Sequence, residues 1–132
     1  MKISTTTADY YDEKNNLVSP AQAVNKIAGT GFKALDCSFN SLEHESLLGG
    51  DKWEEMINDA GEAAARHGMV FSQAHTPMGP TLDQGLKGQE FLELTRRSLV
   101  GAAMLCIKWS VIHIDDIPGL FSREHTKLNI RN

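Results

Sequence analysis

Two histidines, His75 and His113, have the residue type and the position to do chemistry. They lie at or near the ends of two apolar runs with strand character, residues 69–75 and 109–115, and each run follows a segment with helical spacing. In proteins built from parallel strands and helices, binding groups gather at the carboxyl ends of the strands. Imidazole is a common ligand for zinc and manganese-type ions. The pattern therefore makes His75 and His113 the candidates for binding a substrate or a metal ion.

Two aspartates are weaker candidates for the same site. Asp36 lies inside an otherwise apolar run, residues 33–39. An unpaired carboxylate would be costly there, so Asp36 requires a hydrogen-bond partner or a place at the mouth of a barrel. A structural role for Asp36 is favoured over a substrate contact. Asp115 follows His113 and could orient its imidazole through a carboxylate–imidazole bond, or it is an ordinary loop residue like Asp116.

The other histidines and both cysteines are interpreted as structural. His67 lies on the apolar face near the carboxyl end of a helical segment, where a packing or capping role is expected. His44 and His125 fall in polar sequence and are expected to be solvated. Cys37 and Cys106 have no CxxC spacing and are predicted to be free, mostly buried thiols.

Local signals place the helices that must position these residues. Ser19-Pro20-Ala21-Gln22 combines an N-cap, a first-turn proline and a capping-box glutamine, so a helix is predicted to begin at Pro20 and to end at residues 29–31. Asp51, with Glu54 three residues later, predicts a second capping box and a helix that ends at Gly68. A third helix is predicted over about residues 89–106, with a buried face made of Leu92, Leu99, Ala102, Ala103 and Cys106.

Four strand-like runs alternate with these three helices. The strand centres repeat roughly every 30–40 residues, the length of one strand–helix–strand unit, which favours right-handed crossovers between parallel neighbours. Two architectures share this pattern: an open doubly wound sheet and the first half of an eight-stranded (β/α) barrel. No glycine-rich phosphate loop, GxGxxG or GxxxxGK[ST], follows any run, which favours the barrel. We predict an α/β fold and treat residues 1–132 as a single partial domain.

Composition excludes several classes of function. With 132 residues and 41% apolar content, the chain can bury one modest core. A net charge of −4 without a basic stripe argues against a nucleic-acid partner. There is no apolar signal core and no run long enough to span a bilayer, so we expect no membrane partner and a soluble, cytoplasmic protein.

Four ordered motifs make the sequence resemble the sugar phosphate isomerase/epimerase family, whose members are xylose isomerase-like TIM barrels. The resemblance covers essentially the whole chain and is carried by Gly31-Phe32-Lys33-Ala34-Leu35-Asp36, Phe71-Ser72-Gln73-Ala74-His75, Leu94-Thr95-Arg96-Arg97-Ser98 and Val111-Ile112-His113. Such barrels are about twice as long as this chain. One departure is Cys106, where similar sequences often have glycine, which weakens the expectation of a left-handed helix cap.

The resemblance implies a chemistry for the intact barrel. His75 and His113 match positions where histidines of the family bind metal or substrate. A divalent metal, Mn, Zn, Mg or Co, would be completed by carboxylates from later strands, and a sugar or sugar phosphate would be isomerised or epimerised through an enediol-like intermediate. By the same resemblance, this chain alone is expected to be inactive and to hold no metal unless further strands supply ligands.

Two other functions stay open. An endonuclease IV-like phosphodiesterase barrel is one, although the acidic charge balance disfavours it. A noncatalytic module that dimerises through its exposed sheet is the other. Four parallel strands leave one sheet face and two edges uncovered, so we expect either a truncated piece of a longer enzyme or a homodimer that covers the open face.

Overall fold

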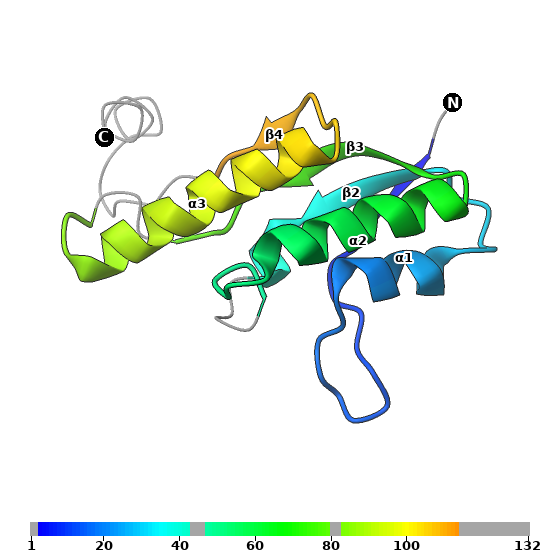
Figure 1. Ribbon diagram of the computed structural model, residues 1–132, viewed down its shortest axis with the longest axis horizontal. Helices are drawn as coiled ribbons and strands as arrows, with labels where there is room; N and C mark the ends of the chain where they lie inside the picture. Colours follow the sequence, from blue (N-terminus) through cyan, green and yellow to red (C-terminus); the bar gives the residue numbers. More distant parts are fainter. Residues whose placement is uncertain (1–2, 43–46, 80–82, 114–132) are drawn as a thin grey trace, which may run out of the picture.

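The computed structural model describes residues 3–42, 47–79 and 83–113 as a parallel α/β unit. Its elements are β1 (Ser4–Thr6), α1 (Pro20–Ile27), β2 (Ala34–Ser38), the short 3₁₀ helix η1 (Phe39–Leu42), α2 (Trp53–Arg66), β3 (Val70–His75), α3 (Leu86–Met104) and β4 (Ser110–Val111). The four strands are all parallel, in the order β1-β2-β3-β4, and the helices alternate with them (Figure 1). The predicted order of elements is therefore confirmed.

The core lies between the helices and one face of the sheet. Its fully buried centre joins the sheet residues Leu35, Cys37 and Ala74 to Val24 of α1 and Ile57 of α2. Helices α1 and α2 pack side by side, as Figure 1 shows. These apolar side chains are buried on one side of the sheet, and no helix of the described residues covers the opposite side, which we call the open face.

Of the two predicted capping boxes, the one at the start of α1 is confirmed and the one at the start of α2 is wrong. At α1, Ser19 is the N-cap: its Oγ accepts from the Gln22 backbone N–H, and the Gln22 side chain accepts from the Ser19 N–H at 2.9 Å. At α2 the N-cap is Lys52 and no side chain caps the helix, so the predicted Asp51 cap is wrong. Because α2 begins at Trp53, Asp51 stands one residue too early to reach the unpaired N–H groups of the first turn.

The face of α3 that packs against the core is not the face predicted from the spacing of its leucines. Leu92 and Leu99 are exposed, as are Ala103 and Cys106, whereas Ala102 is buried as expected. The buried positions are Gly88, Phe91, Ser98, Gly101 and Ala102. A Cβ on Gly101 would lie only 3.1 Å from the Phe39 ring, so the helix approaches the core through small residues and its leucines are rotated aside.

Cys106 ends α3 in a left-handed cap, although a residue other than glycine weakened the expectation of such a cap. Its φ is 57°, in the left-handed region. Its N–H donates to Ala103 O at 3.0 Å, and the Ile107 N–H donates to Ala102 O at 2.9 Å, which is the Schellman pattern. The chain therefore leaves α3 towards β4 as a glycine would direct it, with backbone strain at Cys106.

Candidate functional site

The candidate site lies at the carboxyl ends of β2, β3 and β4 on the open face. Register pairs Ser38 with His75 and His75 with Val111, so the end of β3 stands between the ends of its two neighbours. Partners in register on parallel strands point to the same face of the sheet. His113 follows β4 by two residues, which brings it to the same edge.

A β-bulge decides which face His75 occupies. The pairing runs Leu35 with Phe71 and then Asp36 with Gln73, so Ser72 is an extra residue in β3. Without this extra residue, His75 would lie on the opposite face from Asp36, because side chains alternate along a strand. The Ser72 hydroxyl donates to the Leu35 carbonyl at 3.1 Å, which fixes the bulge.

The central contact of the site joins His75 to Asp36. The His75 Nδ1 lies 3.0 Å from Asp36 Oδ1 and 2.9 Å from Oδ2. The Asp36 side chain is only 13% exposed, so it has the hydrogen-bond partner that its burial demands. A carboxylate at Nδ1 favours the tautomer with the proton on Nδ1, which leaves the Nε2 lone pair available to a ligand. Asp36 therefore holds the His75 ring in place.

His113 lies against His75. The two imidazole rings stack, with centroids 5.6 Å apart and an angle of 24° between their planes. The structure thus brings together three of the four predicted site residues, His75, His113 and Asp36. The fourth, Asp115, lies outside the described residues, as do Asp116, His44 and His125.

The donor set of this cluster fits part of a metal site. Two stacked imidazoles can supply two nitrogen ligands, and the carboxylate behind His75 is the usual device for orienting a ligating histidine. Among the described residues, no group of three or more His, Cys, Asp or Glu side chains is arranged to hold an ion. The remaining ligands of a four- to six-coordinate ion must therefore come from elsewhere.

Thr7 is a supporting residue that sequence reasoning missed. Its N–H donates to Asp36 O at 2.9 Å, its hydroxyl donates to the same carbonyl at 3.2 Å, and that hydroxyl accepts the Ser38 N–H at 3.2 Å. These bonds fasten the chain just after β1 to both sides of Cys37. A threonine directly after a β-branched strand was the available signal, but its partners lie about thirty residues away.

The cysteines and His67 have no part in the site. Burial, with a further contribution from the Asp36 charge, raises the pKa of the Cys37 thiol, so Cys37 stays protonated and serves packing. Cys37 is free and buried as predicted, whereas Cys106 is free but exposed because its cap places it at the surface. His67 is the C-cap residue of α2, in line with the predicted packing or capping role, and its Nε2 lies 2.9 Å from Asn25 Oδ1 of α1.

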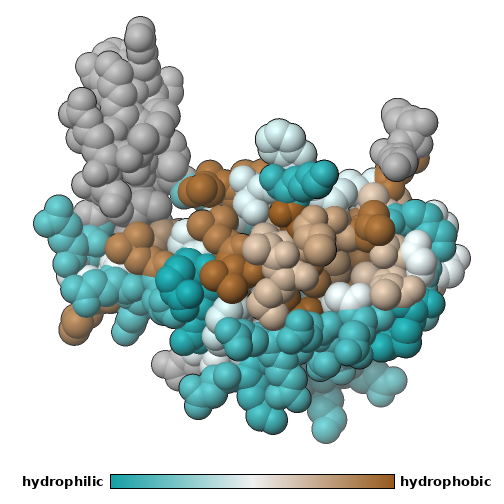
Figure 2. Space-filling view, turned by 45° about the horizontal axis from the view of Figure 1, so that its top comes forward, coloured by the Kyte–Doolittle hydropathy of each residue, from teal (hydrophilic) through white to brown (hydrophobic). Residues whose placement is uncertain are grey.

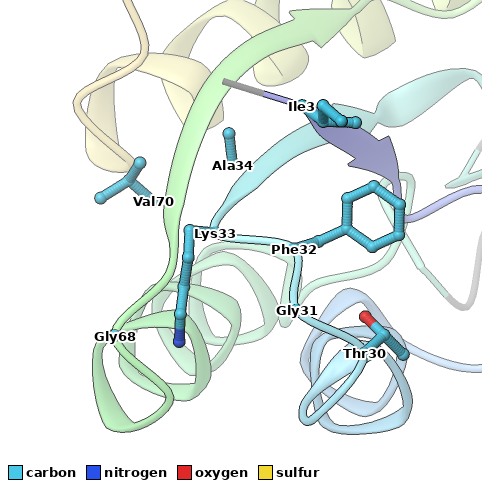
Figure 3. A pocket seen from close by; sticks show the side chains of 8 residues that line it. All are labelled: Ile3, Thr30, Gly31, Phe32, Lys33, Ala34, Gly68 and Val70. Carbon is cyan, nitrogen blue, oxygen red and sulfur yellow. The ribbon is translucent and has the colours of Figure 1, made fainter. Parts of the chain in front are cut away.

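A separate cavity of about 650 Å³ lies at the amino ends of the strands (Figure 3). It is lined by Ile3, Thr30, Gly31, Phe32, Lys33, Ala34, Gly68 and Val70. Ala34 and Val70 are register partners on the open face, at the opposite end of the sheet from His75. The Lys33 ammonium donates to the His67 carbonyl at 3.1 Å rather than entering the cavity as a free charge. The cavity therefore has the apolar character of an unfilled packing surface.

Comparison with solved structures defines the class of fold. The chain is similar to 3-keto-D-glucoside 4-epimerase YcjR from E. coli in its apo form, with 17% identity and a TM-score of 0.59 over 99% of this chain and 49% of that one. It is also similar to a xylose isomerase domain protein from Alicyclobacillus acidocaldarius subsp. acidocaldarius, with 17% identity and a TM-score of 0.59 over 98% of this chain and 43% of that one. No family model and no curated protein matches the sequence.

These similarities establish the fold. The four strands and their helices are consistent with the first half of a TIM barrel. The predicted α/β half-barrel is confirmed, and the open doubly wound sheet is not needed. The chain spans about half the length of the solved structures that it matches.

Proposed function

We propose that this chain is the amino-terminal portion of a metal-dependent sugar or sugar-phosphate isomerase or epimerase, inactive by itself. The observation that carries the proposal is the Asp36–His75–His113 cluster at the carboxyl ends of the strands. In TIM barrels this end of the sheet holds the active site. The solved structures with the same fold include an epimerase that acts on a keto-glucoside, which supports a carbohydrate substrate.

His75 and His113 would bind a divalent ion, Mn, Zn, Mg or Co, through ring nitrogens that face the barrel mouth. A bound ion would polarise a sugar carbonyl or hydroxyl. Asp36 holds the His75 ring in one orientation and keeps the proton on Nδ1, so that the other nitrogen stays available. The carboxylates that would complete the ion's shell and move the substrate proton would come from outside the described residues. The partial ligand set is the reason to expect an inactive chain.

Metal titration by calorimetry tests the cluster without an activity assay. Zn²⁺ and Mn²⁺ are added to the 132-residue chain and to His75→Ala, His113→Ala and Asp36→Asn. We expect each alanine variant to abolish the binding heat, and Asp36→Asn to weaken affinity about 10- to 100-fold. His67→Ala is the matched control, because His67 lies before the amino end of β3, at the opposite end of that strand from His75, and is bonded to Asn25. Binding unaffected by the cluster variants, or lost equally in His67→Ala, would refute the proposal.

The net charge weighs against the endonuclease-like alternative. A chain with a charge of −4 offers poor attraction to a phosphate backbone, so neither DNA cleavage nor DNA binding is proposed. We propose a cytoplasmic location, which the two free thiols support. None of the helices in the described part of the chain has the length and apolar character needed to cross a membrane.

A further inference from the structure

The open face and the two sheet edges define an unfilled surface. Side chains that are large, apolar and exposed gather there and beside it: Ile3, Val70, Trp109, Val111 and Ile112. Figure 2 shows apolar residues in a continuous band across one side of the molecule, bordered by a hydrophilic fringe. A band of this kind, joined to unpaired strands, is typical of an interface.

The free edges of the two outer strands indicate what could cover this surface. Among the described residues, β1 pairs only with β2 and β4 pairs only with β3, so the two outer strands each present one free edge. Four parallel strands are half of the eight that close a TIM barrel. The sheet superposes on about half of two solved xylose isomerase-like chains, so its arrangement already matches that of the larger fold.

We propose that a second copy of this chain closes the barrel. A twofold axis parallel to the strands would set β4 of each copy beside β1 of the other, in parallel, at two equivalent junctions. This arrangement consumes all four free edges and covers the open face of both copies. It also turns the cavity at the amino ends of the strands, lined by Ile3, Phe32 and Val70, into part of a shared interior.

The second copy would also add imidazoles to the candidate site. The same axis carries the partner's His75 and His113 to the same mouth of the barrel, which raises the number of imidazoles from two to four. A shell of four to six ligands is then within reach. What the shared mouth does rests on the proposed function, but the closure itself rests only on the edges and the open face.

Ser110 allows the closure to be tested at one backbone atom. The Trp109 and Val111 carbonyls accept from the Ala74 and Thr76 N–H groups of β3, at 3.0 and 2.9 Å. Because backbone groups alternate along a strand, the Ser110 N–H points to the free edge. Ser110→Pro therefore removes a donor that only the partner needs, and leaves the β3–β4 bonds intact. Ser110→Ala keeps the N–H and is the matched control.

Light scattering coupled to gel filtration, with EDTA present, measures the mass from about 1 to 100 µM chain. We expect about twice 14.5 kDa for the wild type and Ser110→Ala, and 14.5 kDa for Ser110→Pro with unchanged circular dichroism. A second variant, Val70→Lys, puts a charge into the shared interior at a position that is 63% exposed in one copy. It should raise the dimer dissociation constant at least tenfold, whether or not Ser110→Pro folds.

Three results would overturn the closed dimer. These are a 14.5 kDa wild type throughout the range, a dimer that neither Ser110→Pro nor Val70→Lys weakens, and assemblies that grow with concentration. The metal experiment is separate. The wild type should bind about one Zn²⁺ ion per two chains, and His75→Ala should remain a dimer but lose this binding. A metal-free dimer would refute the proposed function alone, and a metal-binding monomer would refute the dimer alone.

Discussion

Arg97 holds the loop between β2 and α2, and its replacement is the sharpest test of how the site edge is built. Its Nη1 donates to the carbonyls of Leu48, Gly49 and Gly50 at 3.1, 2.9 and 3.1 Å. Its Nε donates to Glu93 at 2.9 Å, and its guanidinium lies 5.6 Å from the Trp53 ring centroid. This loop connects the end of β2 to α2, at the same edge of the sheet as Asp36 and His75.

The size of the effect follows from these contacts. One Nη1 has two hydrogens, so its three carbonyl contacts amount to about two hydrogen bonds, each worth about 1.5 kcal/mol when the donor is charged. The cation–π contact adds about 0.5 kcal/mol. The Arg97 side chain is only 21% exposed, so its salt bridge to Glu93 is partly shielded, although the Glu93 side chain is 43% exposed. We expect Arg97→Ala to lose about 2–4 kcal/mol of unfolding free energy.

Urea denaturation followed by circular dichroism measures this loss at pH 7. Arg97→Lys is the matched control: it keeps the charge but cannot present a planar fork to several carbonyls, so it should recover less than half of the loss. Arg96→Ala is a second control, since the Arg96 side chain is 58% exposed and is held by Glu93 on the same helix. A loss below about 0.5 kcal/mol in Arg97→Ala, or full recovery in Arg97→Lys, would contradict this reasoning.

Three smaller effects should also be measurable. Cys106→Gly should stabilise the fold by about 0.5–1 kcal/mol in urea denaturation, because the left-handed strain of about 1–2 kcal/mol that it removes is only partly offset by the larger unfolded-state entropy of glycine. Cys106→Ala should show no gain, and an equal gain there would disprove strain as the cause. Thr95→Val should stabilise by about 1 kcal/mol, since the buried Thr95 hydroxyl has no hydrogen-bond partner among the described residues, whereas Thr95→Ser should not. Hydrogen bonds from Arg96 and then Arg97 lower the pKa of Glu93 from 4.5 to about 2, so this carboxylate contributes stability that is present above about pH 5 and lost as the pH falls through about 2. The difference in urea midpoint between wild type and Glu93→Gln should therefore shrink over that interval, and a difference that is constant with pH would count against the pairing.

Local signals were enough for the parts of the fold that short-range chemistry decides. The Ser19 and Gln22 capping box depends on residues three apart, so the sequence predicted the start of α1 correctly. The alternation of strands and helices placed His75 and His113 at the ends of adjacent strands, and in a parallel sheet this brings them to the same edge.

The parts that failed depend on contacts distant in sequence. The exposed leucines of α3 have the right spacing for a buried face, but Gly101 and Ser98 let the helix approach the core on another side, which only the position of Phe39 decides. Arg97 was noted only as part of an adjacent pair of arginines, because its partners are backbone carbonyls of a loop almost fifty residues earlier. Every residue has a backbone carbonyl, so no pattern of residue types could have revealed these contacts of Arg97.

The site itself depends on a β-bulge in β3 that the sequence does not reveal. Strict alternation along β3 would put His75 on the same side as Phe71, and Phe71 is buried with the core. The extra residue at Ser72 reverses the face for the rest of the strand, so that Ala74 joins the core and His75 meets Asp36 on the open face. The bulge contains no glycine to mark it, and it exists only in the pairing of β3 with β2. Asp36 could be predicted to need a partner, but the identity of that partner follows from this single register shift.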